Sequence, residues 1–219
     1  MNILSCDVSY SSFGLVLFST EENKILLNET YKFSSLSSIT KKEQLLFKNI
    51  PFVKREKVSL IKELKKTKKV KTQEDKYQDE LAEYWNNIRL YEFLKNINRV
   101  KADYKIDLII SEAQFSKISD VFAIVRVASV TDDYISKFKL YYPNSWHKIL
   151  FNNCKLDRKE YKKITKEYID NKVIPKLFEV VKFNSEDEYD AMALIMTYLI
   201  DNKLAESFET YYIEKERVK

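Results

Sequence analysis

Gly14 is the only glycine in a chain of 219 residues, which also has just three prolines. Such scarcity excludes collagen-like, glycine-rich and proline-rich chains. It also excludes phosphate-binding loops of the GxxxxGK[ST] and GxGxxG types, because each needs at least two glycines. Apolar residues make up 45% of the chain and charged residues 32%, which is typical of a globular protein. We therefore expect a globular fold without a nucleotide cofactor.

Histidine and cysteine are almost as rare as glycine. His147 is the single histidine, and Cys6 and Cys154 are the two cysteines. They are too few for an HExxH, Cys₄ or Cys₂His₂ zinc site. A bound metal would have to be held mainly by carboxylates, which favours Mg²⁺, Mn²⁺ or Ca²⁺.

The N-terminal sequence does not have the features of a signal peptide. It lacks a basic opening stretch, and Asp7 interrupts the first apolar run. No apolar run approaches the roughly 20 residues of a membrane-spanning helix. We expect a cytoplasmic protein with no membrane partner, whose cysteines remain buried thiols.

Positive charge is concentrated in residues 41–76. This segment holds thirteen Lys or Arg and five acids, a net charge of +8 against +5 for the whole chain. A basic block on a slightly acidic body is typical of a polyanion contact. Charge alone leaves a second interpretation open, in which the segment is a solvated lysine-rich excursion.

Hydropathy patterns predict an α/β fold. Three short strands at 2–8, 13–19 and 24–33 are joined by short polar separators, so they form an antiparallel meander. Further strands are expected at 107–112 and 138–142, and helices at 77–103, 118–137, 143–151, 157–180 and 186–201. Helical crossovers would add the later strands in parallel. We predict one domain over residues 1–219, a mixed sheet flanked by helices, with a basic insertion at about 34–76.

Four acids fall where chemistry is expected. Asp7 and Glu112 each end a buried strand, and Asp187 and Asp190 share one face of the last helix. Carboxylates brought together repel one another, and divalent cations usually compensate. The alternative is structural, because Ser185 and Glu188 form the pattern of a capping box. That pattern explains Asp190 least well, because Asp190 lies on the apolar stripe.

Four ordered segments resemble the motifs of a known family. Asp7–Gly14 (DVSYSSFG) is similar to the opening of RuvC-like Holliday junction resolvases of the RNase H-like superfamily. Ile109–Phe115 (IISEAQF) and Asp187–Leu194 (DEYDAMAL) resemble the family's second and third acidic elements. Tyr142–Lys148 (YPNSWHK) is similar to a Pro-x-x-Trp-x-Lys stretch of phage and poxvirus members. The chain departs from many relatives at Ser9, where they have glycine, and in its basic segment.

The resemblance implies an RNase H-like fold and a Mg²⁺-dependent endonuclease. Such an enzyme resolves four-way and other branched DNA by paired nicks as a homodimer. Asp7, Glu112, Asp187 and Asp190 would be catalytic and would hold two Mg²⁺ ions, with Mn²⁺ as a substitute. Asp7 would bridge the two ions. A phage-encoded member would act in the cytoplasm of its bacterial host.

Other side chains are candidates for DNA contact. Phe115, Lys117 and Lys148 lie in or beside the family motifs, and the basic segment adds Lys65, Lys66, Lys68 and Lys69. Core packing is the alternative for Phe115, a plain surface position for Lys148, and a packed ring for His147. Two other functions also stay open: another RNase H-like nuclease that cuts RNA–DNA hybrids or trims ends, and a non-catalytic DNA-binding protein.

Overall fold

The computed structural model describes residues 1–8, 12–33, 89, 91–113, 138–152, 157–179 and 181–204. The chain divides into two units, Met1–Lys32 with Val100–Lys219, and Phe33–Arg99. Several predictions lie outside the described residues: the basic insertion at 34–76, the helix at 118–137, the first part of the helix at 77–103, Cys154, and the DNA-contact candidates Phe115, Lys117, Lys65, Lys66, Lys68 and Lys69.

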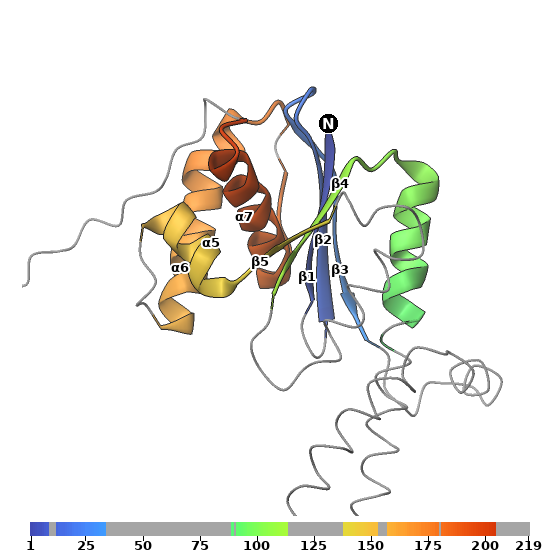
Figure 1. The fold of residues 1–219 in the computed structure, drawn as a ribbon, viewed down its shortest axis with the longest axis horizontal. Helices are drawn as coiled ribbons and strands as arrows, with labels where there is room; N and C mark the ends of the chain where they lie inside the picture. Colours follow the sequence, from blue (N-terminus) through green and yellow to red (C-terminus); the bar gives the residue numbers. More distant parts are fainter. Residues whose placement is uncertain are drawn as a thin grey trace, which may run out of the picture. The chain divides into compact units, whose positions relative to one another are not determined.

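Five strands form one mixed sheet in the first unit. They are β1 (Asn2–Val8), β2 (Ser12–Ser19), β3 (Lys24–Lys32), β4 (Leu108–Glu112) and β5 (Phe138–Tyr141). Their order is β3-β2-β1-β4-β5 (Figure 1). The pairs β1–β2 and β2–β3 are antiparallel, and β1–β4 and β4–β5 are parallel. The predicted mixed sheet, antiparallel in its first three strands and parallel in the later ones, is thereby confirmed.

Helices α5 (Pro143–Phe151), α6 (Arg158–Tyr168) and α7 (Glu186–Asp201) lie on one side of this sheet (Figure 1). Side chains alternate along a strand, so Ile3 of β1, Val16 of β2 and Ile110 of β4 face α7 and join its core. Residues 191–197 of α7 are all buried, because the helix is covered by the sheet and by its neighbouring helices. The expected helices at 143–151 and 186–201 are confirmed.

The helix predicted at 157–180 is wrong in its second half. Asp157 caps α6 with a full capping box, in which Glu160 is the partner. After Tyr168 the chain continues as a π-helical turn, η3 (Ile169–Val173), and a 3₁₀ turn, η4 (Ile174–Lys176). Pro175 has no backbone N–H to continue an α-helical ladder, so a helix could not have run on unbroken to residue 180.

Residues 91–103 are helical, and their buried positions are Phe93, Ile97 and Val100. The spacing of apolar residues in the sequence predicts a stripe that contains Tyr91, Leu94 and Ile97. Ile97 is buried as predicted, whereas Tyr91 is 38% exposed. The aromatic residues at 91 and 93 allow either frame. None of the described helices is long and apolar enough to span a membrane.

Candidate active site

Two of the predicted acids, Asp7 and Glu112, occupy adjacent positions on the neighbouring strands β1 and β4. Strands β1 and β4 are parallel, and their last ladder pair is Cys6 with Ser111. Asp7 and Glu112 are the next residues, so they leave the same edge of the sheet side by side. Alternation from Ile3 and Ile110 places both side chains on the face that carries α7.

The single glycine brings the other two acids to this edge. Gly14 is the partner of Asp7 in the β1–β2 ladder. A Cβ added at Gly14 would lie 2.4 Å from the carbonyl carbon and oxygen of Asp187 and 2.8 Å from the backbone nitrogen of Glu188. Only a residue without a side chain lets the first turn of α7 approach the strand so closely. Asp187 is further held by Ser12, whose Oγ donates a hydrogen bond to Asp187 Oδ2 at 2.5 Å.

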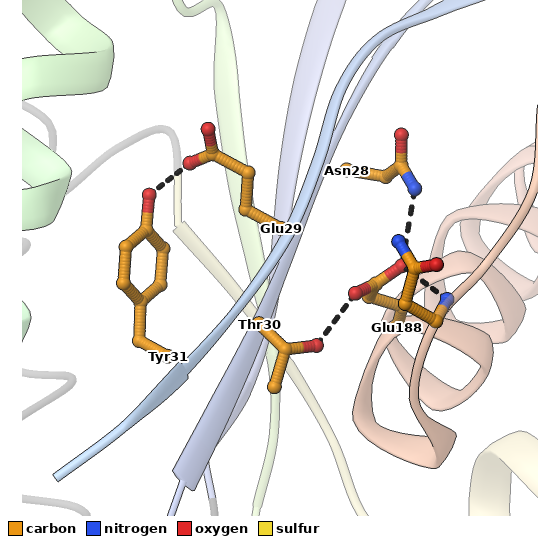
Figure 2. A pocket seen from close by; sticks show the side chains of 6 residues that line it. Asn28, Glu29, Thr30, Tyr31 and Glu188 are labelled. Carbon is orange, nitrogen blue, oxygen red and sulfur yellow. Dashed lines mark hydrogen bonds between the residues drawn. The ribbon is translucent and has the colours of Figure 1, made fainter.

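The start of α7 is capped differently from the prediction. Ser185 Oγ accepts a hydrogen bond from the backbone N–H of Glu188 at 3.2 Å, so the serine half of the capping box is confirmed. The reciprocal half is wrong, because the Glu188 carboxylate accepts from the backbone N–H of Asn184 at 3.0 Å. It also accepts from Asn28 Nδ2 at 3.0 Å and Thr30 Oγ1 at 2.6 Å (Figure 2). Glu188 is 1% exposed and ties α7 to β3.

The pocket in Figure 2 lies beside this tie. Its lining residues are Asn28, Glu29, Thr30, Tyr31, Asn184 and Glu188. None of the four predicted acids belongs to that lining. The pocket therefore shares no residue with the group of four acids.

The four predicted acids form one electrostatic group. Asp7 is 7% exposed. Burial raises the pKa of Asp7 well above its usual range, and the charges of Asp190, Glu112 and Asp187 raise it further, while Lys162 opposes them. Burial likewise raises the pKa of Asp190 to about 7, with Lys162 opposing and Glu112 and Asp187 adding to the shift. Glu112, Asp187 and Asp190 therefore all act on the buried Asp7.

Glu112 is held by an indole that the sequence did not mark as part of the site. Trp146 Nε1 donates a hydrogen bond to Glu112 Oε1 at 3.1 Å. Burial raises the pKa of Glu112, while this hydrogen bond and Arg158 lower it. Trp146 lies in the Pro-x-x-Trp-x-Lys stretch, so the motif carried a signal for a residue near the acids.

His147 lies in an aromatic stack. Its ring is parallel to that of Tyr161 at a centroid distance of 3.5 Å and makes an edge contact with Trp146 at 3.9 Å. Burial lowers the pKa of His147 to about 4, so the ring is neutral at pH 7. Its Nδ1 has no hydrogen-bond partner within the described part of the chain. These contacts favour the packed interpretation of His147.

The cations that act on the acids come from α6. Lys148, the predicted DNA contact of α5, is exposed. Lys162 lowers the pKa values of Asp7 and Asp190, and Arg158 lowers that of Glu112. Arg158 and Lys162 are four residues apart in a helix that looked merely amphipathic in the sequence.

The chemistry of these acids fits a hard divalent cation. Oxygen donors are the ligands that Mg²⁺ and Mn²⁺ prefer, and the buried Asp7 lies within the electrostatic reach of three half-buried carboxylates, those of Glu112, Asp187 and Asp190. In the described ranges, no three or more His, Cys, Asp or Glu side chains are already gathered closely enough to hold a metal ion. Carboxylates without a cation between them repel one another.

Acid titration tests the raised pKa of Asp190 in the metal-free protein. Burial, together with the charges of Glu112 and Asp187, raises the folded-state pKa of Asp190 from 3.8 to about 7, so the folded chain binds this proton more tightly than the unfolded chain. The resulting destabilisation is present above about pH 7 and disappears as the pH falls from about 7 to about 4. We expect the melting temperature of the wild type in EDTA, relative to that of Asp190→Asn, to rise as the pH falls through this range. The lowered pKa of His147 has the opposite effect on stability, but it is present in both proteins and cancels from the difference. A difference that stays constant with pH would contradict the raised pKa of Asp190.

No protein-family model matches the chain, and no curated protein sequence matches it. Among solved structures it is similar to RuvC of Thermus thermophilus, with 14% identity and a TM-score of 0.49 over 93% of this chain and 96% of that one. It is also similar to T. thermophilus RuvC in complex with a Holliday junction substrate, with 13% identity, a TM-score of 0.49 and the same coverage. The fowlpox virus Holliday junction resolvase is a third neighbour, with 11% identity and a TM-score of 0.45 over 94% of this chain and 100% of that one. These neighbours belong to the group that the motifs resemble, and they are too distant to assign a role to any residue.

Proposed function

We propose that this chain is a divalent-metal-dependent endonuclease that resolves branched DNA, four-way junctions in particular, by paired nicks. The observation that carries the proposal is that Glu112, Asp187 and Asp190, from a strand end and one helix, all act electrostatically on the buried Asp7 at the end of the neighbouring strand. Branched DNA is favoured because the ordered motifs around these acids resemble those of RuvC-like resolvases.

The four acids would hold Mg²⁺, in two sites as the resemblance implies, with Mn²⁺ as a substitute. When bound, such an ion polarises a phosphoryl oxygen and lowers the pKa of a bound water. The chain's own contribution is orientation. Trp146 fixes one oxygen of Glu112, and Ser12 fixes one oxygen of Asp187. Hydrogen bonds of this kind set the direction of ligand oxygens before a metal or substrate arrives.

Paired nicks in two strands need two active sites, so the proposal includes a homodimer. The purified full chain should have the mass of two copies in light scattering at micromolar concentration. A strictly monomeric mass together with paired nicking would contradict this part of the proposal and leave the nuclease itself intact.

Cleavage of defined substrates tests the function. The full chain would be incubated with end-labelled synthetic four-way junction, linear duplex and RNA–DNA hybrid, each with Mg²⁺, with Mn²⁺ and with excess EDTA. We expect symmetric nicks in the junction with either metal, little cutting of the linear duplex and none in EDTA. Preferred cutting of the hybrid would favour a different RNase H-like nuclease, and no cutting of any substrate would contradict the proposal.

Trp146→Phe separates orientation of Glu112 from packing. The variant keeps an aromatic ring beside Phe151 but loses the N–H that binds Glu112. We expect the Mn²⁺ concentration for half-maximal cleavage to rise by about 10- to 100-fold, the usual cost of losing a hydrogen bond to a metal ligand. Tyr141→Phe is the matched control, because it removes an aromatic donor whose 3.0 Å bond goes to Asp201. An equal Mn²⁺ requirement in both variants would contradict the role of Trp146.

A further inference from the structure

Helix α6 collects its cations on one face. They are Arg158, Lys159, Lys162, Lys163 and Lys166, which we call the α6 basic face. At 3.6 residues per turn these five positions fall within an arc of about 140°. The buried residues Tyr161, Thr165 and Tyr168 lie on one side of this arc, and the acids Glu160 and Glu167 lie on the other. The sequence showed the charges of this helix but gave no reason to connect them with the acids.

Contacts of α6 place one end of this face at the predicted active site. The ammonium group of Lys162 pairs with the carboxylate of Glu186, which begins α7 and precedes Asp187. On the other flank, the ring of Tyr161 stacks on His147 of α5. The preceding residue in α5 is Trp146, which binds Glu112. The helix is therefore fixed to α7, which carries Asp187 and Asp190, and to α5, which holds Glu112 through Trp146. The effects of Lys162 and Arg158 on these acids agree with that placement.

The outer part of the face is accessible. The Lys163 side chain is 77% exposed, and its only recorded ion pair in the described part of the chain is with Glu167 at 3.8 Å. Lys159 is also exposed. An exposed pair within one helix contributes well under about 1 kcal/mol, so a stronger anion can replace the carboxylate.

Carboxylates repel a phosphodiester backbone, so positive charge on a neighbouring surface favours its approach to the acids. We propose that the α6 basic face binds the phosphate backbone of a nucleic acid strand and leads it to the acids, with Arg158 and Lys162 nearest to them. The inference rests on the proposed nuclease function and adds a binding surface that the motifs did not indicate. On this side of the sheet Lys148 was the predicted contact with DNA, and the proposal assigns that contact to α6.

The salt dependence of binding tests this surface. Kd would be measured by fluorescence anisotropy in EDTA for a labelled four-way junction and a linear duplex, from about 50 to about 200 mM salt. Lys159→Ala/Lys163→Ala should lower the slope of log Kd against log salt by about 1.8, because each phosphate contact contributes about 0.9. Over this range the affinity of the variant then falls about tenfold less than that of the wild type. Junction and linear duplex should change alike, because phosphate contacts carry little sequence information.

The matched control is Lys24→Ala/Lys105→Ala. Lys24 begins β3 and Lys105 precedes β4, at the sheet edge opposite to Asp7, and the Lys105 side chain is 85% exposed. In this control variant, the slope of log Kd against log salt should equal that of the wild type. An unchanged slope in the α6 variant, or an equal decrease in the control, would overturn the inference. Cleavage by the wild type is measured in parallel. If the wild type cleaves but the slope of the α6 variant is unchanged, the nuclease function is supported and the binding surface is contradicted. If the wild type does not cleave but the slope is reduced, the binding surface is supported and the nuclease function is contradicted.

Discussion

Asp7→Asn is expected to reduce cleavage of a four-way junction by more than about 100-fold. Losing a hydrogen bond to a metal ligand already costs about 10- to 100-fold, so losing the ligand charge itself should cost more. Asp7 is the acid on which Asp190, Glu112 and Asp187 all act, which places it at the centre of the group. Junction binding in EDTA should persist, because affinity comes mainly from contacts between cations and phosphates. Single-turnover cleavage in Mn²⁺ measures the loss.

Asp107→Asn is the matched control for this variant. Asp107 comes just before the start of β4, at the opposite edge of the sheet, and accepts a hydrogen bond from the backbone N–H of Asn2 at 2.8 Å. That bond holds the pKa of Asp107 below its usual range. An asparagine oxygen can still accept it but carries no charge, so the variant should lose a little stability and leave the rate of cleavage unchanged. Cleavage by Asp7→Asn at the rate of the control would contradict a catalytic role for Asp7.

Gly14→Ala is expected to damage both folding and activity. The added methyl group would lie 2.4 Å from the backbone carbonyl of Asp187, and backbone atoms cannot move aside as a flexible side chain can. Overpacking of this kind costs about 1 to 3 kcal/mol, so the urea midpoint of unfolding should fall clearly. The first turn of α7 must also move away from β2 and take Asp187 with it. Cleavage should therefore fall even where the variant is fully folded.

A change at the other end of β2 separates these effects. Ser19→Ala alters a buried residue whose Oγ accepts a hydrogen bond from the backbone N–H of Glu22 at 3.3 Å. It should lower stability without affecting cleavage by the folded protein. Wild-type stability and activity in Gly14→Ala would contradict the close approach of α7 to β2.

Local patterns predicted the parts of the fold that one segment can specify. The apolar runs of β1, β2 and β4 have no helical period, and Pro143 and Ser185 mark the starts of α5 and α7, so these elements were within reach of the sequence. The end of α6 was not, because nothing before Pro175 signals the change to a π-helical turn.

Sequence patterns predicted where the candidate acids lie in the fold, but not which side chains hold them. Strand ends and a helical face are local features, and they indicated Asp7 and Asp190. Trp146, Lys162 and Glu188 act through partners 34, 24 and 158 to 160 residues away in the chain, and such pairs depend on tertiary packing. Gly14 belonged to a motif, but its physical task depends on α7, which comes more than 170 residues later.

Titration of Mn²⁺ into the metal-free full chain, followed by isothermal calorimetry, tests most directly whether the four acids form a cation site. Saturable binding is expected for the wild type, with affinity at least about tenfold lower in Asp7→Asn and Asp190→Asn and unchanged in Asp107→Asn. Equal affinity in all four proteins, or no binding to the wild type, would contradict the metal-dependent site on which the proposed function depends.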